Sequence, residues 1–262
     1  MPEISRPEAR INYQHTQGNG NTPLLFLNSL GTDFTMWDKV IAELGNRWPI
    51  LRMDTRGHGG SWCGGPDATI GMLAGDSLAV MDAAGVERAT IVGLSLGGLI
   101  AQQIALSHPG RVAGLVLCAT SSAFRPADMW IDRKTRSLAE GSTVFEEPSR
   151  ARWFTEPFLS GDPETAARLV AMVGQTSDFG YAAGCDALAR TDLTEALSAI
   201  RMPTLLISGE QDLATPTAGH ELIASRIPGA RLETLSPAAH MLAVEQPAAT
   251  ARLVAEMAAA SG

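Results

Sequence analysis

A serine flanked by glycines is the feature of this sequence most able to carry out chemistry. The segment Gly93-Leu94-Ser95-Leu96-Gly97-Gly98 follows a buried-strand pattern at 89–93 and begins a stretch with helical spacing. In that context G-x-S-x-G is typical of a nucleophile on a sharp strand-to-helix turn, and the backbone N–H of Leu96 would face an oxyanion. The alternative is a glycine-rich packing turn with an idle serine. A phosphate loop is excluded, because no Gly-Lys-Ser/Thr follows.

A nucleophilic serine needs a histidine as base, and in this arrangement the chain order is serine, acid, histidine. His240 lies in a loop between the last expected strand and the last expected helix. His220 instead falls in a helical pattern after Pro216, and we expect it to be a solvated helix residue. His240 is therefore the predicted general base, which takes the Ser95 proton and later delivers it to the leaving group.

The acid of such a triad follows a strand. Asp212 comes directly after the expected strand 204–208, and Glu210 competes with it two residues away. The other possible acid position, Thr120-Ser121-Ser122, offers no carboxylate. We predict that Asp212 holds the tautomer of His240 and stabilises its charged form.

An oxyanion hole needs a second N–H group, which comes from the loop after the first strand of the parallel sheet. Here that loop is Asn28-Ser29-Leu30-Gly31-Thr32, and the N–H of Leu30 is the candidate donor. Ser29 either binds substrate or supports the turn. His58 follows a different strand, and we expect a structural role with internal hydrogen bonds.

Strand-like and helix-like segments alternate along most of the chain, as the positioning of these residues requires. Short apolar runs predict strands, and helical spacing predicts helices between them, at the following ranges: strands 24–27, 49–54, 89–93, 112–117, 204–208 and 230–235; helices 37–44, 69–84, 96–106 and 244–260. Apolar strands separated by helices predict a mostly parallel central sheet with helices on both faces. Between 121 and 200 helical periods continue without a convincing strand. We therefore expect an α/β core, residues 1–120 and 201–262, with a helical lid insertion at 121–200.

Composition limits the function further. The 20 basic and 28 acidic residues of the 262-residue chain give a net charge of −8, which argues against nucleic acid or an anionic membrane as the main partner. No apolar stretch approaches the roughly 20 residues of a membrane span, and the first ten residues lack a signal-peptide pattern. Three widely spaced cysteines exclude a disulfide framework. We expect a reduced, cytoplasmic protein.

Taken together, the motifs resemble the α/β-hydrolase superfamily and, within it, the 3-oxoadipate enol-lactonases. The resemblance runs from about Asn28 to Pro247, nearly the whole chain. It is carried by the motifs above, by four further segments and by the tail: Asp54-Thr55-Arg56-Gly57-His58-Gly59, Gly209-Glu210-Gln211-Asp212 with Thr215-Pro216, Arg152-Trp153-Phe154, Gly180-Tyr181-Ala182-Ala183-Gly184-Cys185-Asp186-Ala187-Leu188 with Asp192-Leu193, and Ala239-His240 with Val244-Glu245-Gln246-Pro247.

The resemblance implies the α/β-hydrolase fold and the opening of 3-oxoadipate enol-lactone by water, within the β-ketoadipate pathway of aromatic compound catabolism. Ser95 would attack the ring carbonyl while the N–H groups of Leu30 and Leu96 hold the oxyanion. Ring opening leaves an acyl-enzyme, and water activated by His240 releases 3-oxoadipate. The resemblance implies no metal and no organic cofactor. A small lactone or ester is the expected partner, and the sequence does not specify an oligomeric state.

The substrate carboxylate calls for a cationic partner in an otherwise apolar pocket. The first half of the insertion, residues 121–160, supplies five candidate arginines, of which we expect at most one or two to touch the ligand: Arg125, Arg133, Arg136, Arg150 and Arg152. We predict Arg133 as the binding arginine, with Ser29, Trp130 and Trp153 beside it. For each tryptophan, packing inside the insertion is an equal alternative.

One departure from the enol-lactonases concerns the substrate. They tend to carry a polar Ser-Asn pair after the histidine, where this chain has Leu242-Ala243 in a loop expected to border the site. Other serine hydrolases of this fold therefore stay open: a carboxylesterase, another lactonase or a perhydrolase. A non-catalytic ligand receptor on this scaffold is a further alternative, but its usual sign, the loss of a triad residue, is not present.

Overall fold

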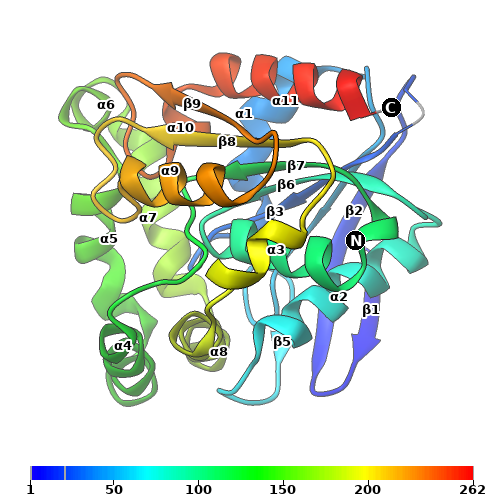
Figure 1. Ribbon diagram of the computed structural model, residues 1–262. Helices are drawn as coiled ribbons and strands as arrows, with labels where there is room; N and C mark the ends of the chain where they lie inside the picture. The colour runs from blue at the N-terminus through cyan, green and yellow to red at the C-terminus, as the bar shows by residue number, and fades with distance from the viewer. Residues whose placement is uncertain (1, 21, 262) are drawn as a thin grey trace.

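A twisted sheet forms the centre of the molecule (Figure 1). The computed structural model describes residues 2–20 and 22–261, and within them nine strands follow the order β1-β2-β4-β3-β6-β7-β8-β9, with β5 paired to β2. The strands are β1 (Glu3–Arg6), β2 (Ala9–Thr16), β3 (Leu24–Leu27), β4 (Ile50–Met53), β5 (Trp62–Cys63), β6 (Ala89–Leu94), β7 (Val112–Cys118), β8 (Thr204–Gly209) and β9 (Arg231–Leu235). From β4 to β9 all neighbouring strands are parallel. The expected mostly parallel sheet is confirmed.

Helices cover both faces of this sheet. The helices α1 (Asp38–Leu44) and α11 (Pro247–Ser261) pack together on one face, and α2 (Ile70–Ala83) and α3 (Leu96–Ser107) pack together on the other (Figure 1). Strands β3, β6, β7 and β8 are buried at every position, because neither face meets water. The helix α9 (Thr217–Arg226) packs against β8 and β9.

The sequence patterns missed the antiparallel edge of the sheet. Strands β1 and β2 form a hairpin, and β2 pairs with β4 and β5 in antiparallel register. In β1 no residue is fully buried, and in β2 only Ala9, Ile11 and Asn12 are buried. Such half-exposed strands carry no continuous apolar run, so their pattern is weak in the sequence.

The C-terminal helix also differs from the expectation. We predicted one helix over 244–260, but the structure has α10 (Leu242–Glu245) and α11, which begins at Pro247. Proline has no N–H to donate and suits the first position of a helix, so the chain turns at Gln246 and starts again.

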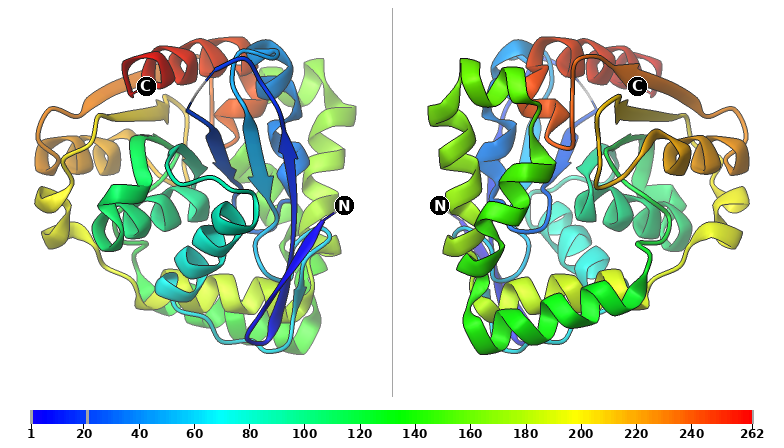
Figure 2. Two further views of the ribbon diagram at one scale, coloured as in Figure 1. Left: turned by 90° about the vertical axis from the view of Figure 1, so that its right-hand side faces the viewer. Right: turned by 90° about the vertical axis from the view of Figure 1, so that its left-hand side faces the viewer.

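Between β7 and β8 the chain forms helices (Figures 1 and 2). In order these are α4 (Ala127–Glu140), η3 (Ser142–Phe145), α5 (Glu146–Trp153), α6 (Glu156–Gly161), α7 (Pro163–Gln175), α8 (Asp178–Arg190) and η4 (Thr194–Ala199), with η denoting a short 3₁₀-helix. The two ends of this segment meet, because Ala123 and Asp192 form an antiparallel bridge and the Leu193 N–H donates to the Ser122 carbonyl at 2.9 Å. We call residues 121–200 the helical insertion. Among the described residues, no helix combines the length and apolar character needed to cross a membrane.

Candidate active site

Ser95 sits on a strained turn between β6 and α3. Its φ is +56° and its ψ is −113°, a backbone conformation that few non-glycine residues adopt. A Cβ atom on Gly93 would lie 2.3 Å from the Gly97 carbonyl oxygen, and one on Gly97 would lie 2.3 Å from the Leu27 carbonyl oxygen. Only glycine fits at either position. The turn leaves the Ser95 side chain facing a pocket and makes Leu96 the first residue of α3.

Asp212 holds the imidazole of His240. Its Oδ2 atom lies 2.9 Å from His240 Nδ1 and accepts the Thr215 hydroxyl at 2.6 Å, while its Oδ1 atom accepts the backbone N–H groups of Ala214 and Thr215. Burial by itself raises the pKa of Asp212, but the charge and hydrogen bond of His240 and the bonds from Thr215 outweigh it and set the pKa at about 2. An ionised Asp212 favours the proton of neutral His240 on Nδ1, which leaves Nε2 free to accept another.

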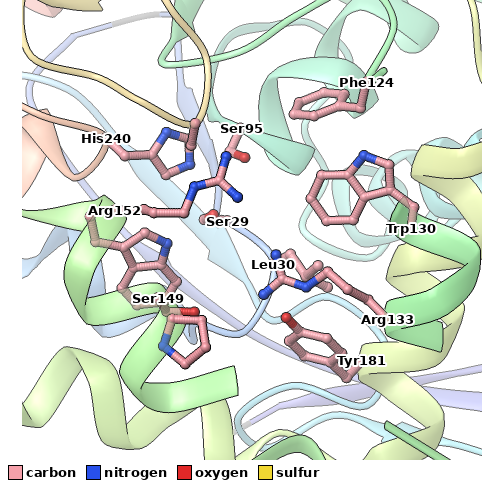
Figure 3. Close-up of a pocket in the computed structure, with 13 residues that line it drawn as sticks. Ser29, Leu30, Ser95, Phe124, Trp130, Arg133, Ser149, Arg152, Tyr181 and His240 are labelled. Atoms are coloured by element: carbon pink, nitrogen blue, oxygen red, sulfur yellow. The ribbon is translucent and has the colours of Figure 1, made fainter. Parts of the chain in front are cut away.

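Ser95 and His240 both line one pocket, which we call the central pocket (Figure 3). Its volume is about 50 Å³. Its walls come from the loop after β3, from the turn at Ser95, from the helical insertion and from the loops that follow β8 and β9: Ser29, Leu30, Ser95, Phe124, Trp130, Arg133, Pro148, Ser149, Arg152, Trp153, Tyr181, Ala214 and His240. The structure thus brings together most of the residues that the sequence singled out.

Two predicted residues lie just outside the pocket wall. Asp212 lies behind His240 and contacts its Nδ1 atom. Leu96 is fully buried, and as the first residue of α3 its N–H has no acceptor within the helix. Its side chain and that of Leu30 lie close to Gly184, since a Cβ atom there would be 2.4 Å from Leu30 and 3.4 Å from Leu96.

The five candidate arginines at 121–160 separate into two groups. Three form ion pairs: Arg125 with Asp192, Arg136 with Glu140 and Arg150 with Glu147. Arg133 and Arg152 instead point into the central pocket (Figure 3). Within residues 2–20 and 22–261, neither has a carboxylate oxygen within 4.0 Å.

Arg133 lies among aromatic rings. Its guanidinium carbon is 4.8 Å from the ring centre of Phe145, 5.3 Å from that of Trp130 and 5.7 Å from that of Tyr181. Its buried Nε has no hydrogen-bond partner in the described structure. Such a cation is held by π-electrons and is free to bind an anion.

The sequence reasoning missed several pocket residues. Tyr181 is 2% exposed, stacks on Phe145 with ring centres 4.9 Å apart, and has a pKa raised by burial. It lies in a motif that carried the family resemblance, which was the available signal. Nothing local in the sequence marks Phe124 or Ser149, because only the packing of the insertion brings them to the pocket.

His220 is buried, which contradicts its expected solvated position. It lies in α9 with none of its surface exposed, and its Nε2 accepts the Thr120 N–H at 3.0 Å. The Thr120 hydroxyl in turn donates to the Ser95 carbonyl at 2.7 Å. His220 is buried because α9 packs against β8 and β9. This burial lowers the pKa of His220 to about 4.

The expected structural role of His58 can be compared with its surroundings. His58 is fully buried with its Nδ1 3.0 Å from the Arg56 carbonyl, so the expected internal hydrogen bond is confirmed.

Leu242 and Ala243 do not line the central pocket. They are fully buried in α10, which corrects the expectation that this pair borders the site. Trp153 lines the pocket and also packs against Phe154, so it has both of the positions that the sequence left open, in the pocket wall and inside the insertion.

Among the described residues, no group of three or more His, Cys, Asp or Glu side chains is arranged to hold a metal ion. The groups that can react are a serine hydroxyl, an imidazole with a buried carboxylate, and two cations without carboxylate partners. This set suits nucleophilic attack on a carbonyl carbon.

The fold and this arrangement define the class of the protein. A family model described as the alpha/beta hydrolase fold matches residues 22–247, so the chain belongs to the α/β-hydrolase family. It is 34% identical to 3-oxoadipate enol-lactonase 2 of Acinetobacter baylyi over 94% of this chain and 92% of that protein. Two crystal structures are also similar. A hydrolase from Pseudomonas aeruginosa PA01 has a TM-score of 0.93 and 36% identity, covering 98% of this chain and 97% of that one. The enol-lactonase from Burkholderia xenovorans LB400 has a TM-score of 0.92 and 33% identity, covering 98% and 99%.

Proposed function

We propose that this hydrolase opens an enol lactone, with 3-oxoadipate enol-lactone as substrate and 3-oxoadipate as product. Ser95 is the nucleophile, His240 the general base and acid, and Asp212 the orienting acid. The observation that carries the proposal is the 2.9 Å contact between Asp212 and His240, because it orients an imidazole in the same small pocket as Ser95. The similarity to two named enol-lactonases supports the choice of substrate.

The reaction then runs in two halves. The Ser95 oxygen attacks the lactone carbonyl as its proton passes to His240 Nε2, and the N–H groups of Leu30 and Leu96 stabilise the oxyanion. The ring C–O bond breaks, and the enol oxygen takes the proton from His240. The enol tautomerises to the ketone. A water molecule then gives a proton to His240 and attacks the acyl carbon, the ester bond to Ser95 breaks, and the Ser95 oxygen takes the proton back from His240 as the acid leaves.

The charge of the central pocket supports an anionic substrate. Arg133 and Arg152 both point into it, and neither has a carboxylate partner among the described residues. In this proposal the cation of Arg133 binds the substrate carboxylate, while Trp130 and Trp153 pack against the ring. Ser29 is the neighbouring hydroxyl that can bond to the substrate.

The proposal extends to the helical insertion and to the location of the protein. Residues 121–200 act as a lid over a core made of residues 1–120 and 201–262, since the insertion supplies Trp130, Arg133, Arg152 and Trp153 to the pocket. The acidic net charge of −8 fits a small-molecule enzyme of the cytoplasm.

A panel of lactones and esters tests the proposal. We expect the enol lactone to be turned over with a higher kcat/KM than p-nitrophenyl esters, and Ser95→Ala to fall to near background with its fold intact by circular dichroism. Clear preference for short neutral esters would instead assign a carboxylesterase. A fluorophosphonate probe that fails to label Ser95 in the folded protein would indicate a non-catalytic receptor.

A further inference from the structure

A second cavity, which we call the side hollow, lies against the central pocket. Its volume is about 390 Å³, and it reaches the surface at Leu213, which is 70% exposed. Most of its lining is apolar and comes from the start of the insertion and from the loop after β8: Phe124, Pro126, Met129, Trp130, Leu213 and Pro216.

Four residues line both cavities and therefore form the wall between them: Phe124, Trp130, Arg152 and Ala214. The guanidinium of Arg152 lies on the pocket side of this wall, toward Ser95 (Figure 3). Among residues 2–20 and 22–261 it makes one hydrogen bond, to the carbonyl oxygen of exposed Leu213 at 3.3 Å. No carboxylate oxygen within the described residues lies within 4.0 Å of it.

The other walls of the central pocket are held more firmly. Arg133 is enclosed by three aromatic rings, and Tyr181 stacks on Phe145 with an interplanar angle of 4°. The Trp153 carbonyl accepts the Met241 N–H at 2.9 Å, which ties the insertion to the loop of His240. A pocket of about 50 Å³ must open to admit a substrate, and the long hydrogen bond of Arg152 to Leu213 makes Arg152 the side chain that we expect to move.

We propose that the side hollow is the entrance vestibule of the central pocket and that Arg152 is its gate, which recognises the anionic group of an incoming small carboxylate. The apolar lining accepts the uncharged part of the molecule, and the unpaired cation at its inner end attracts the carboxylate. When the substrate arrives, Arg152 would release the neutral Leu213 carbonyl and bind the charged carboxylate. A guanidinium bonds more strongly to a charged acceptor than to a neutral one. The inference rests on the proposed function for its substrate.

Substitution of Arg152 should change kcat/KM in opposite directions for an anionic and a neutral substrate. In Arg152→Ala we expect kcat/KM for the anionic lactone to fall at least about tenfold and to decrease less steeply with added salt than in the wild type. The same variant should raise kcat/KM for a neutral ester with a long acyl chain, because the wall between the cavities opens. Arg150→Ala is the matched control, since Arg150 lies on the same helix and pairs with Glu147 outside the pocket. Equal changes for both substrates, or behaviour like the control, would overturn the gate.

Obstruction of the vestibule tests the route itself. Gly219 in α9 lines the side hollow, and a Cβ atom there would meet nothing within 4 Å, so a side chain can start from this position without a clash at its Cβ. We expect Gly219→Trp to lower kcat/KM for the lactone at least about fivefold. An obstructed entrance slows the binding of substrate to the free enzyme, and kcat/KM includes this step. Gly110→Trp is the control, because its Cβ position is equally open and it lines neither cavity. Equal kcat/KM in the two tryptophan variants would overturn the route.

Binding of a six-carbon dicarboxylate, adipate, separates this inference from the proposed function. The probe is titrated by calorimetry into Ser95→Ala protein, where no turnover is needed. We expect adding Arg152→Ala to weaken binding about tenfold and adding Arg150→Ala to leave it unchanged. If the lactone is not hydrolysed but this difference is found, the proposed function fails and the gate stands. If the lactone is hydrolysed and Arg152→Ala binds adipate like the control, the gate alone fails.

Discussion

At the scale of single residues, the site depends on which carboxylate reaches His240. Glu210 and Asp212 are two residues apart in the sequence, yet the structure separates their roles. Asp212 is 3% exposed and bonded to His240, whereas Glu210 is exposed and accepts the Ser236 hydroxyl at 2.5 Å. Only a carboxylate buried beside the imidazole can hold its tautomer and offset its charge.

We therefore expect Asp212→Asn to lower kcat by about 10⁴-fold, because an amide keeps the shape but favours the wrong tautomer of His240. Steady-state kinetics with the lactone or with a short ester measure the loss. The control is Glu210→Gln, which should change kcat by less than about twofold. A larger loss in the Glu210 variant than in the Asp212 variant would refute the choice of acid.

At the scale of elements, the turn between β6 and α3 is the most constrained segment of the site. It brings the end of a strand, the first turn of a helix and the end of β3 into contact over very short distances. A side chain at Gly97 has no space, since its Cβ would lie 2.3 Å from the backbone of Leu27. Backbone atoms of a buried strand cannot shift without disturbing the sheet.

For this reason we expect Gly97→Ala to lower the free energy of unfolding by about 3 kcal/mol or more, and to abolish turnover. Urea unfolding followed by fluorescence gives the difference. Gly71→Ala in α2 is the matched control, because the nearest atom to its Cβ is 3.7 Å away and alanine favours a helix by about 1 kcal/mol. A Gly97 variant as stable as wild type would mean that the turn is not strained as described.

At the scale of the whole molecule, two buried histidines make stability depend on pH. Burial lowers the pKa values of His58 and His220 to about 4, from an ordinary value of 6.5. Between pH 6.5 and pH 4 the unfolded chain binds protons at these histidines and the folded chain does not. Stability therefore falls as the pH drops through this window.

For each of the two histidines, the free energy of unfolding should be about 2 kcal/mol lower at pH 5 than at pH 7.5. His220→Gln should remove the contribution of His220 to this pH dependence of the free energy of unfolding, because glutamine does not titrate. The glutamine carbonyl can accept the Thr120 N–H in place of Nε2. Urea unfolding at both pH values is the measurement. His108→Gln, at an exposed position, should keep the wild-type slope. A His220→Gln slope equal to the wild-type slope would show that His220 does not titrate as its burial implies.

The sequence predicted what local spacing encodes. The parallel strands, the turn at Ser95 and the prediction that Asp212 and His240 act with Ser95 follow from short motifs at the ends of strands. Since the carboxyl ends of parallel strands meet at one edge of a sheet, their order along the chain was enough to expect one site. The hairpin of β1 and β2 was missed, because an exposed edge needs no apolar run.

What only the tertiary structure decided are the contacts between distant segments. The five candidate arginines at 121–160 look alike in the sequence, and packing alone pairs three of them on the surface and turns Arg133 and Arg152 into the pocket. His220 looked solvated until α9 was placed against the sheet. Motif spacing fixes backbone geometry within a few residues, whereas burial and charge pairing depend on which surfaces meet, and that is settled only when the whole chain packs.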